Sequence, residues 1–257
     1  MKEVNSALAQ RANAAPRPTK LRRLQHSIQS TGLVRALCDA AMNVIGYDAA
    51  KDGAFDSRFG TDTTGRLEPD ELGIADSEAR EQAVLYLPSP PSITRWMLQS
   101  IGVKHQDFAF VDLGCGKGRV VLVASEYPFR RVVGVEIADV LVRVARSNVA
   151  KYASASRCTA VEIVCQDATT FAWPADPLVV HLYHPFGSAV TRRVLQQLDA
   201  SLQQNPRPVV IAYLAYSSAM PDVDAVFAEF PWLQQTRFEQ SVSGNYDWLF
   251  FANRQHD

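Results

Sequence analysis

The stretch Val111-Asp112-Leu113-Gly114-Cys115-Gly116-Lys117-Gly118-Arg119 places three glycines at alternate positions just after an acidic residue. Apolar segments flank it at Phe108–Leu113 and Val120–Ala124, so the order predicts a strand, a glycine loop and a helix. A loop that cradles pyrophosphate relies on backbone N–H groups at a helix N-terminus. Asp112 adds a carboxylate, which suits a ligand with a cationic end. Because position 119 is Arg, the dinucleotide-binding spacing G-x-G-x-x-G is not met.

The apolar pattern predicts three later strands, each followed by a polar residue at its carboxyl end. Arg131–Ile137 ends near Glu136, about 20 residues past the glycine loop, which is the spacing of an acid that binds ribose hydroxyls. The other two strands are expected at Val161–Gln166 and Leu178–Tyr183. In an open α/β sheet, ligands bind beyond the carboxyl ends of the strands. We therefore expect one cavity to be lined by Asp112, Glu136, Asp167 and His184.

Predicted strands and helices alternate from residue 108 onward. Apolar spacing predicts helices over Arg119–Tyr127, Asp139–Tyr152, Ala189–Gln203 and Asp222–Phe230. A fifth strand is expected over Pro208–Tyr216, and two further strands, Leu233–Val242 and Tyr246–Ala252, flank a Gly244-Asn245 turn. The sequence therefore predicts an α/β fold with a seven-stranded doubly wound sheet. It consists of five parallel βα units and an antiparallel C-terminal hairpin.

The chain is predicted to divide into an N-terminal helical extension, residues 1–85, and a ligand-binding domain, residues 86–257. The extension begins with an Ala-rich arm over residues 1–20, and helical spacing follows over Leu21–Tyr47. The polar stretch Asp48–Asp70 predicts a long loop, and such loops often serve as lids. We expect the helices and this loop to form a lid over the cavity.

Two short helices are expected before the first strand. One is predicted over Asp76–Leu87 and the other over Ser92–Ile101. Pro88-Ser89-Pro90-Pro91 separates them, and either Ser89 or Ser92 is expected near the cap of the second helix.

The composition is that of an ordinary globular protein, with 47% hydrophobic and 21% charged residues among 257. A net charge of −1 gives no strong field to gather nucleic acid, so we expect a small-molecule substrate rather than a nucleic acid partner. The four cysteines form no C-x-x-C pair, and no metal site is expected. No apolar run approaches the ~20 residues of a membrane span. We expect a cytoplasmic protein without a membrane partner; the pattern leaves the oligomeric state open.

The glycine loop and the ordered strand ends resemble those of the class I S-adenosylmethionine (SAM)-dependent methyltransferases. The resemblance covers residues from about Tyr86 to the C-terminus and implies SAM as cosubstrate or substrate. It implies that Glu136 binds the ribose hydroxyls and that Asp167 accepts a hydrogen bond from the adenine amine. The full set of implied cofactor contacts is Asp112, Gly114, Cys115, Gly116, Glu136, Ile137, Asp167, Ala168, Tyr86 and Pro88.

Two stretches in the first third of the chain resemble a poorly described bacterial subgroup of these proteins and imply its N-terminal helical lid. They are Phe55-Asp56-Ser57-Arg58-Phe59-Gly60-Thr61-Asp62-Thr63-Thr64-Gly65 and Tyr86-Leu87-Pro88-Ser89-Pro90. That subgroup commonly has Asn-Pro-Phe after the fourth strand and Asn-Pro after the fifth. This chain has His184-Pro185-Phe186 and Ala215-Tyr216 there instead. A related layout occurs in protein-lysine methyltransferases of the non-SET type.

The stretch His184-Pro185-Phe186-Gly187 resembles motif IV, which reads Asn/Asp-Pro-Pro-aromatic in many N-methyltransferases. His184 is the first catalytic candidate, because a neutral ring nitrogen can orient an amine or take its proton. The alternative is that it only shapes the pocket wall. Tyr183 and Tyr213 are further candidates, with core packing as the alternative. The odd offset between Tyr213 and Tyr216 predicts opposite faces of the strand, and His181 is expected to be a satisfied core residue.

The first functional hypothesis is a SAM-dependent methyltransferase that acts on an amino, carboxyl or hydroxyl group of a small molecule or an exposed side chain. A second keeps SAM but changes the reaction: a lyase or cyclase would make a small cyclic amino acid and methylthioadenosine by intramolecular attack. A third is a SAM-binding partner protein without activity. A nicotinamide dehydrogenase is disfavoured by the spacing of the glycines.

Overall fold

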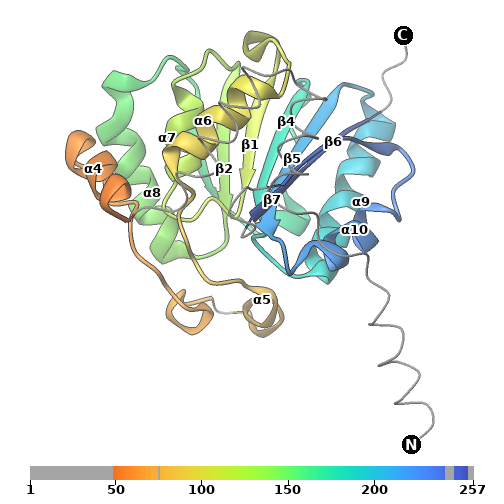
Figure 1. The fold of residues 1–257 in the computed structure, drawn as a ribbon, viewed down its shortest axis with the longest axis horizontal. Helices are drawn as coiled ribbons and strands as arrows, with labels where there is room; N and C mark the ends of the chain where they lie inside the picture. Colours follow the sequence, from red (N-terminus) through yellow and green to blue (C-terminus); the bar gives the residue numbers. More distant parts are fainter. Residues whose placement is uncertain (1–48, 75, 241–245, 254–257) are drawn as a thin grey trace, which may run out of the picture.

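The computed structural model of the chain describes residues 49–74, 76–240 and 246–253 (Figure 1). Three sequence-based expectations lie outside these residues. They are the arm over residues 1–20, the helix at Leu21–Tyr47 and the hairpin turn at Gly244-Asn245.

A seven-stranded sheet in the order β3-β2-β1-β4-β5-β7-β6 forms the centre of the described chain. Strands β1 to β5 run parallel, and β7 is antiparallel to both β5 and β6. The predicted seven-stranded doubly wound sheet is therefore confirmed. The strands are β1 (Ala109–Leu113), β2 (Arg131–Glu136), β3 (Val161–Cys165), β4 (Leu178–Tyr183), β5 (Val209–Tyr216), β6 (Leu233–Gln240) and β7 (Tyr246–Asn253).

The chain changes direction across the sheet between β1 and β4, because β2 and β3 lie on one side of β1 and β4 to β7 lie on the other. Ligand sites of open α/β sheets occur at such a switch point, beyond the carboxyl ends of the strands. The order of the strands therefore directs attention to the ends of β1 and β4.

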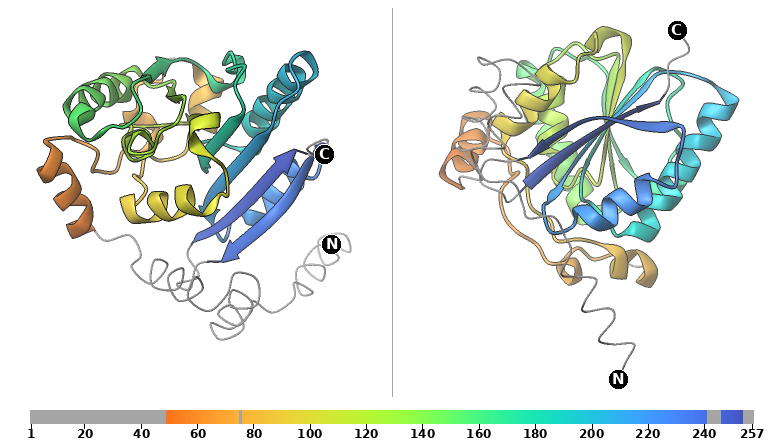
Figure 2. Two further views of the ribbon diagram at one scale, coloured as in Figure 1. Left: turned by 90° about the horizontal axis from the view of Figure 1, so that it is seen from above. Right: turned by 45° about the vertical axis from the view of Figure 1, so that its right-hand side comes forward.

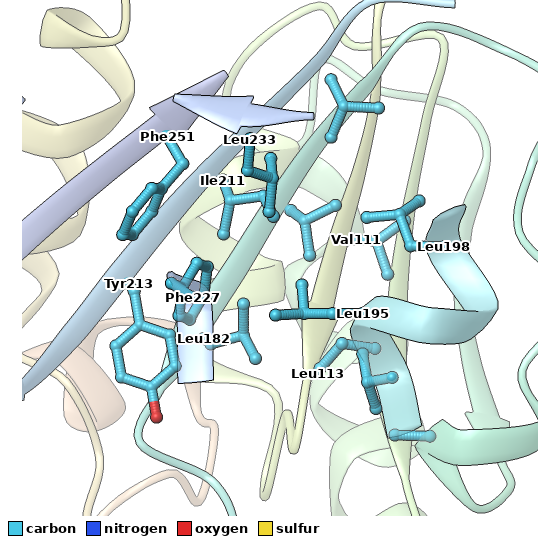
Figure 3. Packing of buried hydrophobic residues seen from close by; sticks show 14 of the residues in the cluster. Val111, Leu113, Leu182, Leu195, Leu198, Ile211, Tyr213, Phe227, Leu233 and Phe251 are labelled. Atoms are coloured by element: carbon cyan, nitrogen blue, oxygen red, sulfur yellow. The ribbon is translucent and has the colours of Figure 1, made fainter. Parts of the chain in front are cut away.

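Helices cover both faces of the sheet (Figure 2). Residues of α6 (Pro91–Ser100), α7 (Arg119–Ser125) and α8 (Asp139–Tyr152) belong to one buried apolar cluster. Residues of α9 (Ser188–Gln204) and α10 (Met220–Phe227) belong to the other. In this second cluster, Val111, Leu182 and Ile211 from three strands face α9 and α10 (Figure 3).

Strand β1 contributes to both clusters because successive side chains point to opposite faces. Val111 and Leu113 lie in the cluster with α9, whereas Phe110 lies in the cluster with α7. All five residues of β1 are buried, as expected for a central parallel strand. The alternation places Asp112 on the α7 side of the sheet, opposite His181 of β4 in register.

The long loop expected over Asp48–Asp70 is only partly correct, because α4 occupies Ala49–Phe59. Phe55 and Phe59 lie four residues apart, on one side of this helix. Both pack on Tyr152 of α8, with ring centroids 5.6 and 4.4 Å from the tyrosine ring. The contact that stabilises α4 therefore comes from a residue far away in the sequence.

The helix expected over Asp76–Leu87 is shorter than predicted. Its observed form, α5, covers Ser77–Gln82 and begins at Asp76, whose side chain accepts a hydrogen bond from the backbone of Ala79. The chain then becomes extended, because Ala83 pairs with Phe186 and Tyr86 pairs with Leu67 as isolated bridges. Between these segments lies the short 3-10 helix η2 (Pro69–Glu71).

A buried carboxylate, that of Asp56 in α4, organises the loop after this helix. It accepts hydrogen bonds from the hydroxyls of Thr61 and Thr63 (both 2.7 Å) and from the backbone N–H groups of Thr63 and Thr64 (both 2.9 Å). Arg119, the first residue of α7, lies 3.4 Å from Asp56 and donates to the Thr63 hydroxyl at 2.6 Å. The loop is thereby tied to the helix that follows the glycine loop.

We expect the substitution Asp56→Ala to lower the free energy of unfolding by about 3–5 kcal/mol, since it leaves the buried Arg119 guanidinium without its carboxylate. The control is Arg66→Ala, which removes an ion pair whose side chains are 65% and 52% exposed. That change should stay below about 1 kcal/mol. Urea unfolding followed by circular dichroism measures both, and equal losses would contradict the assignment.

Candidate functional site

A pocket opens beyond the carboxyl ends of the central strands and encloses about 1190 Å³, its open mouth included. Of the residues predicted from the sequence to form the site, all but Tyr213 line it: Tyr86, Pro88, Asp112, Gly114, Cys115, Gly116, Glu136, Ile137, Asp167, Ala168, Tyr183 and His184. The strand ends therefore converge as predicted.

The glycine loop forms one wall of this pocket and folds back towards β2. The N–H groups of Gly114 and Cys115 both donate to the carbonyl of Val135, at 2.9 and 3.0 Å. Gly116 has φ +55°, in the left-handed region that glycine adopts without a steric cost. A Cβ atom at Gly116 would lie 2.4 Å from the ring of Tyr86, so the loop and this ring need glycine here for their close contact.

The carboxylate of Glu136 binds the backbone of the glycine loop. Its two oxygens accept from the N–H groups of Gly116 and Ala138, both at 2.9 Å. Burial raises the pKa of Glu136, while these backbone hydrogen bonds oppose that rise. A carboxylate oxygen has two lone pairs, so each oxygen keeps acceptor capacity towards the pocket. Glu136 therefore fits a ligand that presents neighbouring hydroxyls, such as a ribose.

The third strand-end acid, Asp167, follows β3 and caps the 3-10 helix η5 (Ala168–Thr170). Its side chain accepts from the backbone N–H of Thr169 at 2.7 Å. That bond orients the carboxylate and engages one of its oxygens. With Ala168 beside it in the pocket lining, Asp167 fits an apolar ring that carries an amine, such as adenine.

The Asp112 carboxylate at the end of β1 is only 3% exposed and is paired with a histidine. Nδ1 of His181 lies 2.7 Å from Oδ1 of Asp112. Burial raises the pKa of Asp112, and the neighbouring His181 opposes that rise. His181 was expected to be a satisfied core residue, but it lines the pocket and its Nε2 has no hydrogen-bond partner among the described residues.

Directly after β4, His184 has φ +38° and is the one non-glycine residue with positive φ in the part of the chain that the structure describes. Its Nδ1 lies 3.0 Å from the hydroxyl of Tyr213. Tyr213 is 1% exposed and does not line the pocket, so its hydroxyl contacts His184 instead. Burial lowers the pKa of His184, while Asp222 opposes that shift.

An aromatic group extends from the pocket along the carboxyl ends of β4 and β5 and the amino end of β7. Tyr183 lines the pocket, and its ring lies 6.0 Å from that of Tyr246. The ring of Tyr246 in turn lies 4.9 Å from that of Tyr216. Tyr213 belongs to the apolar cluster on the other face of the sheet, which confirms that Tyr213 and Tyr216 point to opposite faces.

The segment before α6 forms a second wall. Leu72, Ile74, Ala83 and Tyr86 line the pocket from this side, and in Figure 1 the segment with α5 lies at one end of the sheet. Tyr86 is held in place because its hydroxyl donates to the carbonyl of Thr63 at 2.7 Å.

The Phe55–Gly65 stretch, singled out for its resemblance, does not line the pocket. This stretch instead contacts neighbouring segments that position the pocket lining. The Asn148 side chain donates to the carbonyls of both Asp62 and Lys117, at 2.8 and 2.9 Å. Nζ of Lys117 reaches Asp62 and the carbonyl of Thr64, both at 2.9 Å. Lys117 therefore binds this loop and does not line the pocket.

Comparison with known proteins places residues 110–205 in a family described as a methyltransferase domain. A protein-lysine N-methyltransferase of Saccharolobus islandicus (strain REY15A) is 36% identical over 80 residues, which are 31% of this chain and 49% of the relative. The chain thus spans about half the length of this curated relative.

Two solved structures are similar to this chain, and the first of them supports the fold. A SAM-dependent methyltransferase from Aquifex aeolicus superimposes with a TM-score of 0.53 at 11% identity, over 73% of this chain and 100% of that one. An RNA methyltransferase from Salinibacter ruber in complex with S-adenosyl-L-homocysteine gives a TM-score of 0.46 at 24% identity, over 66% and 96%.

The sequence-based expectation of a small-molecule substrate, with nucleic acid disfavoured, is wrong. The curated relative is named for a protein acceptor, which is a macromolecule. The net charge was a poor guide because it averages over the whole surface and says nothing of a local acceptor site.

Two further findings concern the part of the chain that the structure describes. No helix there is both long and apolar enough to cross a membrane. No group of three or more His, Cys, Asp or Glu side chains is placed to hold a metal ion.

We expect Gly116→Ala to raise the dissociation constant for SAM at least tenfold, because the new methyl group must displace Tyr86 or the loop. Gly60→Ala is the matched control: its φ is +67°, but a Cβ there meets nothing within 4 Å. This control should cost about 1–2 kcal/mol of stability for the left-handed backbone and leave the affinity unchanged. Isothermal titration calorimetry and urea unfolding test the pair; equal affinities would contradict the role of the contact.

The methyltransferase-domain match begins within β1 and ends just after α9, so it includes the glycine loop and all four strand ends that meet in the pocket. The order of the seven strands and the fit of Asp112, Glu136 and Asp167 to a nucleoside with a cationic end agree with that match. The match of residues 110–205 to a methyltransferase domain agrees with the resemblance of the sequence to the class I SAM-dependent methyltransferases, and SAM is the cofactor of that family.

Proposed function

We propose that this protein transfers the methyl group of SAM to the side-chain amine of a lysine in another protein. The observation that carries the proposal is the composition of the single pocket described above. Three strand-end acids suited to SAM share it with Tyr183 and His184, which stand at the end of β4. The named acceptor of the curated relative supports a lysine as the target.

SAM brings a methyl group on a positively charged sulfur, so the protein need not supply a nucleophile of its own. The remaining tasks are to position the acceptor nitrogen, to exclude water and to leave that nitrogen with a free lone pair. We assign the nucleoside to Glu136 and Asp167, and the acceptor to Tyr183 and His184.

The tyrosines at the ends of β4 and β5 and at the start of β7 suit a lysine side chain. The faces of Tyr183, Tyr216 and Tyr246 can attract an ammonium group, and their rings can pack along its apolar stem. Burial raises the pKa of Tyr183, and the neighbouring hydroxyls of Tyr246 and Tyr216 add to that rise. The group therefore offers an aromatic path that ends at the pocket lining.

His184 is proposed to receive or orient the proton of the incoming amine. A lysine amine has an ordinary pKa of about 10.4, so it arrives as an ammonium ion and must lose a proton before it attacks. Burial lowers the pKa of His184, which keeps the imidazole neutral near pH 7 and able to accept. Tyr213 positions the ring through its contact with Nδ1.

The segment from Leu67 to Pro88 is proposed to cover the pocket. It lines the pocket opposite the strand ends, and it is held by the bridge between Leu67 and Tyr86 and by the Asp56 network. A fixed wall on this side would exclude water from the positively charged sulfur. The lid predicted from the sequence, formed by the N-terminal helices and the Asp48–Asp70 loop, stays a prediction. A cytoplasmic location stays a prediction from the sequence.

The proposal predicts incorporation of label from methyl-labelled SAM into a set of purified lysine-rich proteins, with methyllysine in the hydrolysate and S-adenosylhomocysteine as the second product. The same proteins with acetylated lysines form the matched control and should take up no label. Total RNA serves as a separate acceptor arm. Label in RNA alone would contradict the lysine assignment, and methylthioadenosine in place of S-adenosylhomocysteine would contradict methyl transfer.

We expect His184→Gly to lower kcat about 100-fold, within the range for loss of a general acid or base. Glycine adopts positive φ without a steric cost, so the backbone at this position should persist, and the affinity for SAM should not change. Wild type needs neutral His184, whose pKa is lowered from 6.5. The ratio of wild-type to variant kcat should therefore be constant above pH 6.5 and fall only at lower pH. A ratio independent of pH would contradict the role in proton transfer.

A further inference from the structure

Two buried polar atoms in the pocket lining have no hydrogen-bond partner among the described residues. They are Nε2 of His181 and the hydroxyl oxygen of Ser89. His181 is 1% exposed and Ser89 is 3% exposed. An unsatisfied buried polar group is unfavourable, and native proteins leave few of them. Two such atoms in one pocket indicate that a ligand completes their hydrogen bonds.

The surroundings of His181 determine what its free nitrogen can do. The ring lies between Phe110 and Trp248, with centroid distances of 6.3 and 5.8 Å, so its sides are apolar. Nδ1 contacts Oδ1 of Asp112 at 2.7 Å. Where the imidazole is neutral and Asp112 accepts from Nδ1–H, Nε2 keeps its lone pair. The Asp112 oxygens and Nε2 of His181 then offer acceptors to a cation.

Ser89 offers a hydrogen-bond donor, whereas Asp112 and His181 offer acceptors. Pro88, Pro90 and Pro91 surround it and have no N–H group, so Ser89 supplies the donors of this short stretch. The cap residue of α6 is Pro90, without a side-chain hydrogen bond. Ser89 lies next to this cap, as expected, but its hydroxyl does not cap the helix. Its hydroxyl is therefore left to donate to a ligand in the pocket.

We propose that His181 and Ser89, together with Asp112, bind the amino-acid end of SAM. The Asp112–His181 pair accepts from the α-ammonium group, and the Ser89 hydroxyl donates to the α-carboxylate. This assignment rests on the family's cofactor and on no particular acceptor, so it stands or falls separately from the proposed lysine target. It makes the pocket selective for SAM and S-adenosylhomocysteine over nucleosides that lack the amino acid.

The geometry of the sheet supports this placement. Asp112 immediately precedes the turn into the glycine loop, and β1 and β4 pair it with His181 in register. Trp248 contacts both His181 and Trp96 of α6, which places α6, the helix that follows Ser89, on the same face of the sheet. The pair therefore lies on the glycine-loop side of the site, whereas Glu136 and Asp167 follow β2 and β3.

The test compares two ligands by calorimetry, without any methyl acceptor. S-adenosylhomocysteine carries the amino-acid end, and 5′-methylthioadenosine lacks it. Wild type should prefer S-adenosylhomocysteine by about 100-fold or more, since charge-assisted hydrogen bonds are the strong ones. His181→Phe and Ser89→Ala should each weaken S-adenosylhomocysteine about tenfold or more and change the affinity for 5′-methylthioadenosine less than threefold.

Two controls separate binding from structure. Glu136→Gln should weaken both ligands by similar factors, because both contain the ribose. The deaminated analogue of S-adenosylhomocysteine should bind wild type and His181→Phe with similar affinity, because the ammonium group is the partner of His181. Parallel losses for both ligands in His181→Phe, or a wild-type protein that does not distinguish them, would overturn the proposal.

Discussion

Gly116 is the point on which the arrangement of the site depends. Its N–H donates to Glu136 at 2.9 Å, and its missing side chain leaves room for the ring of Tyr86. Because Gly116 has no Cβ atom, the glycine loop can contact both Glu136 at the end of β2 and Tyr86 in the second wall of the pocket. The Asp56 network fixes Thr63, whose carbonyl holds the Tyr86 hydroxyl. The buried ion pair with Arg119 is therefore connected to the pocket by a short chain of contacts.

The sheet and most of the pocket lining could be predicted from the sequence because both depend on local patterns. An apolar run of strand length that ends near Asp112, Glu136 or His184 predicts both the strand and the end of the strand that faces the ligand. The strand β4 was expected at its observed bounds, Leu178–Tyr183. Parallel strands meet at one edge, so the polar ends of separate runs had to come together.

The features that sequence reasoning missed depend on partners far away in the chain. Helix α4 was expected to be a loop because its composition is polar, and the ring that stabilises it, Tyr152, belongs to α8. His181 looked like a core residue because its partner is set by the register between β1 and β4. No local pattern contains that register, and a shift of one residue would turn His181 to the other face.

His181 of β4 and His184, directly after this strand, are assigned to two different parts of the site, the cofactor and the acceptor. His181 and His184 lie at an odd offset, so a regular strand would direct them to opposite faces of the sheet. Both nevertheless line the same pocket, and His184 has the left-handed backbone, φ +38°. For a residue other than glycine this conformation costs roughly 1–3 kcal/mol. The contact with Tyr213 holds His184 in this conformation. The strained backbone directly after β4 therefore turns His184 towards the pocket, whereas a regular strand would direct it to the other face of the sheet.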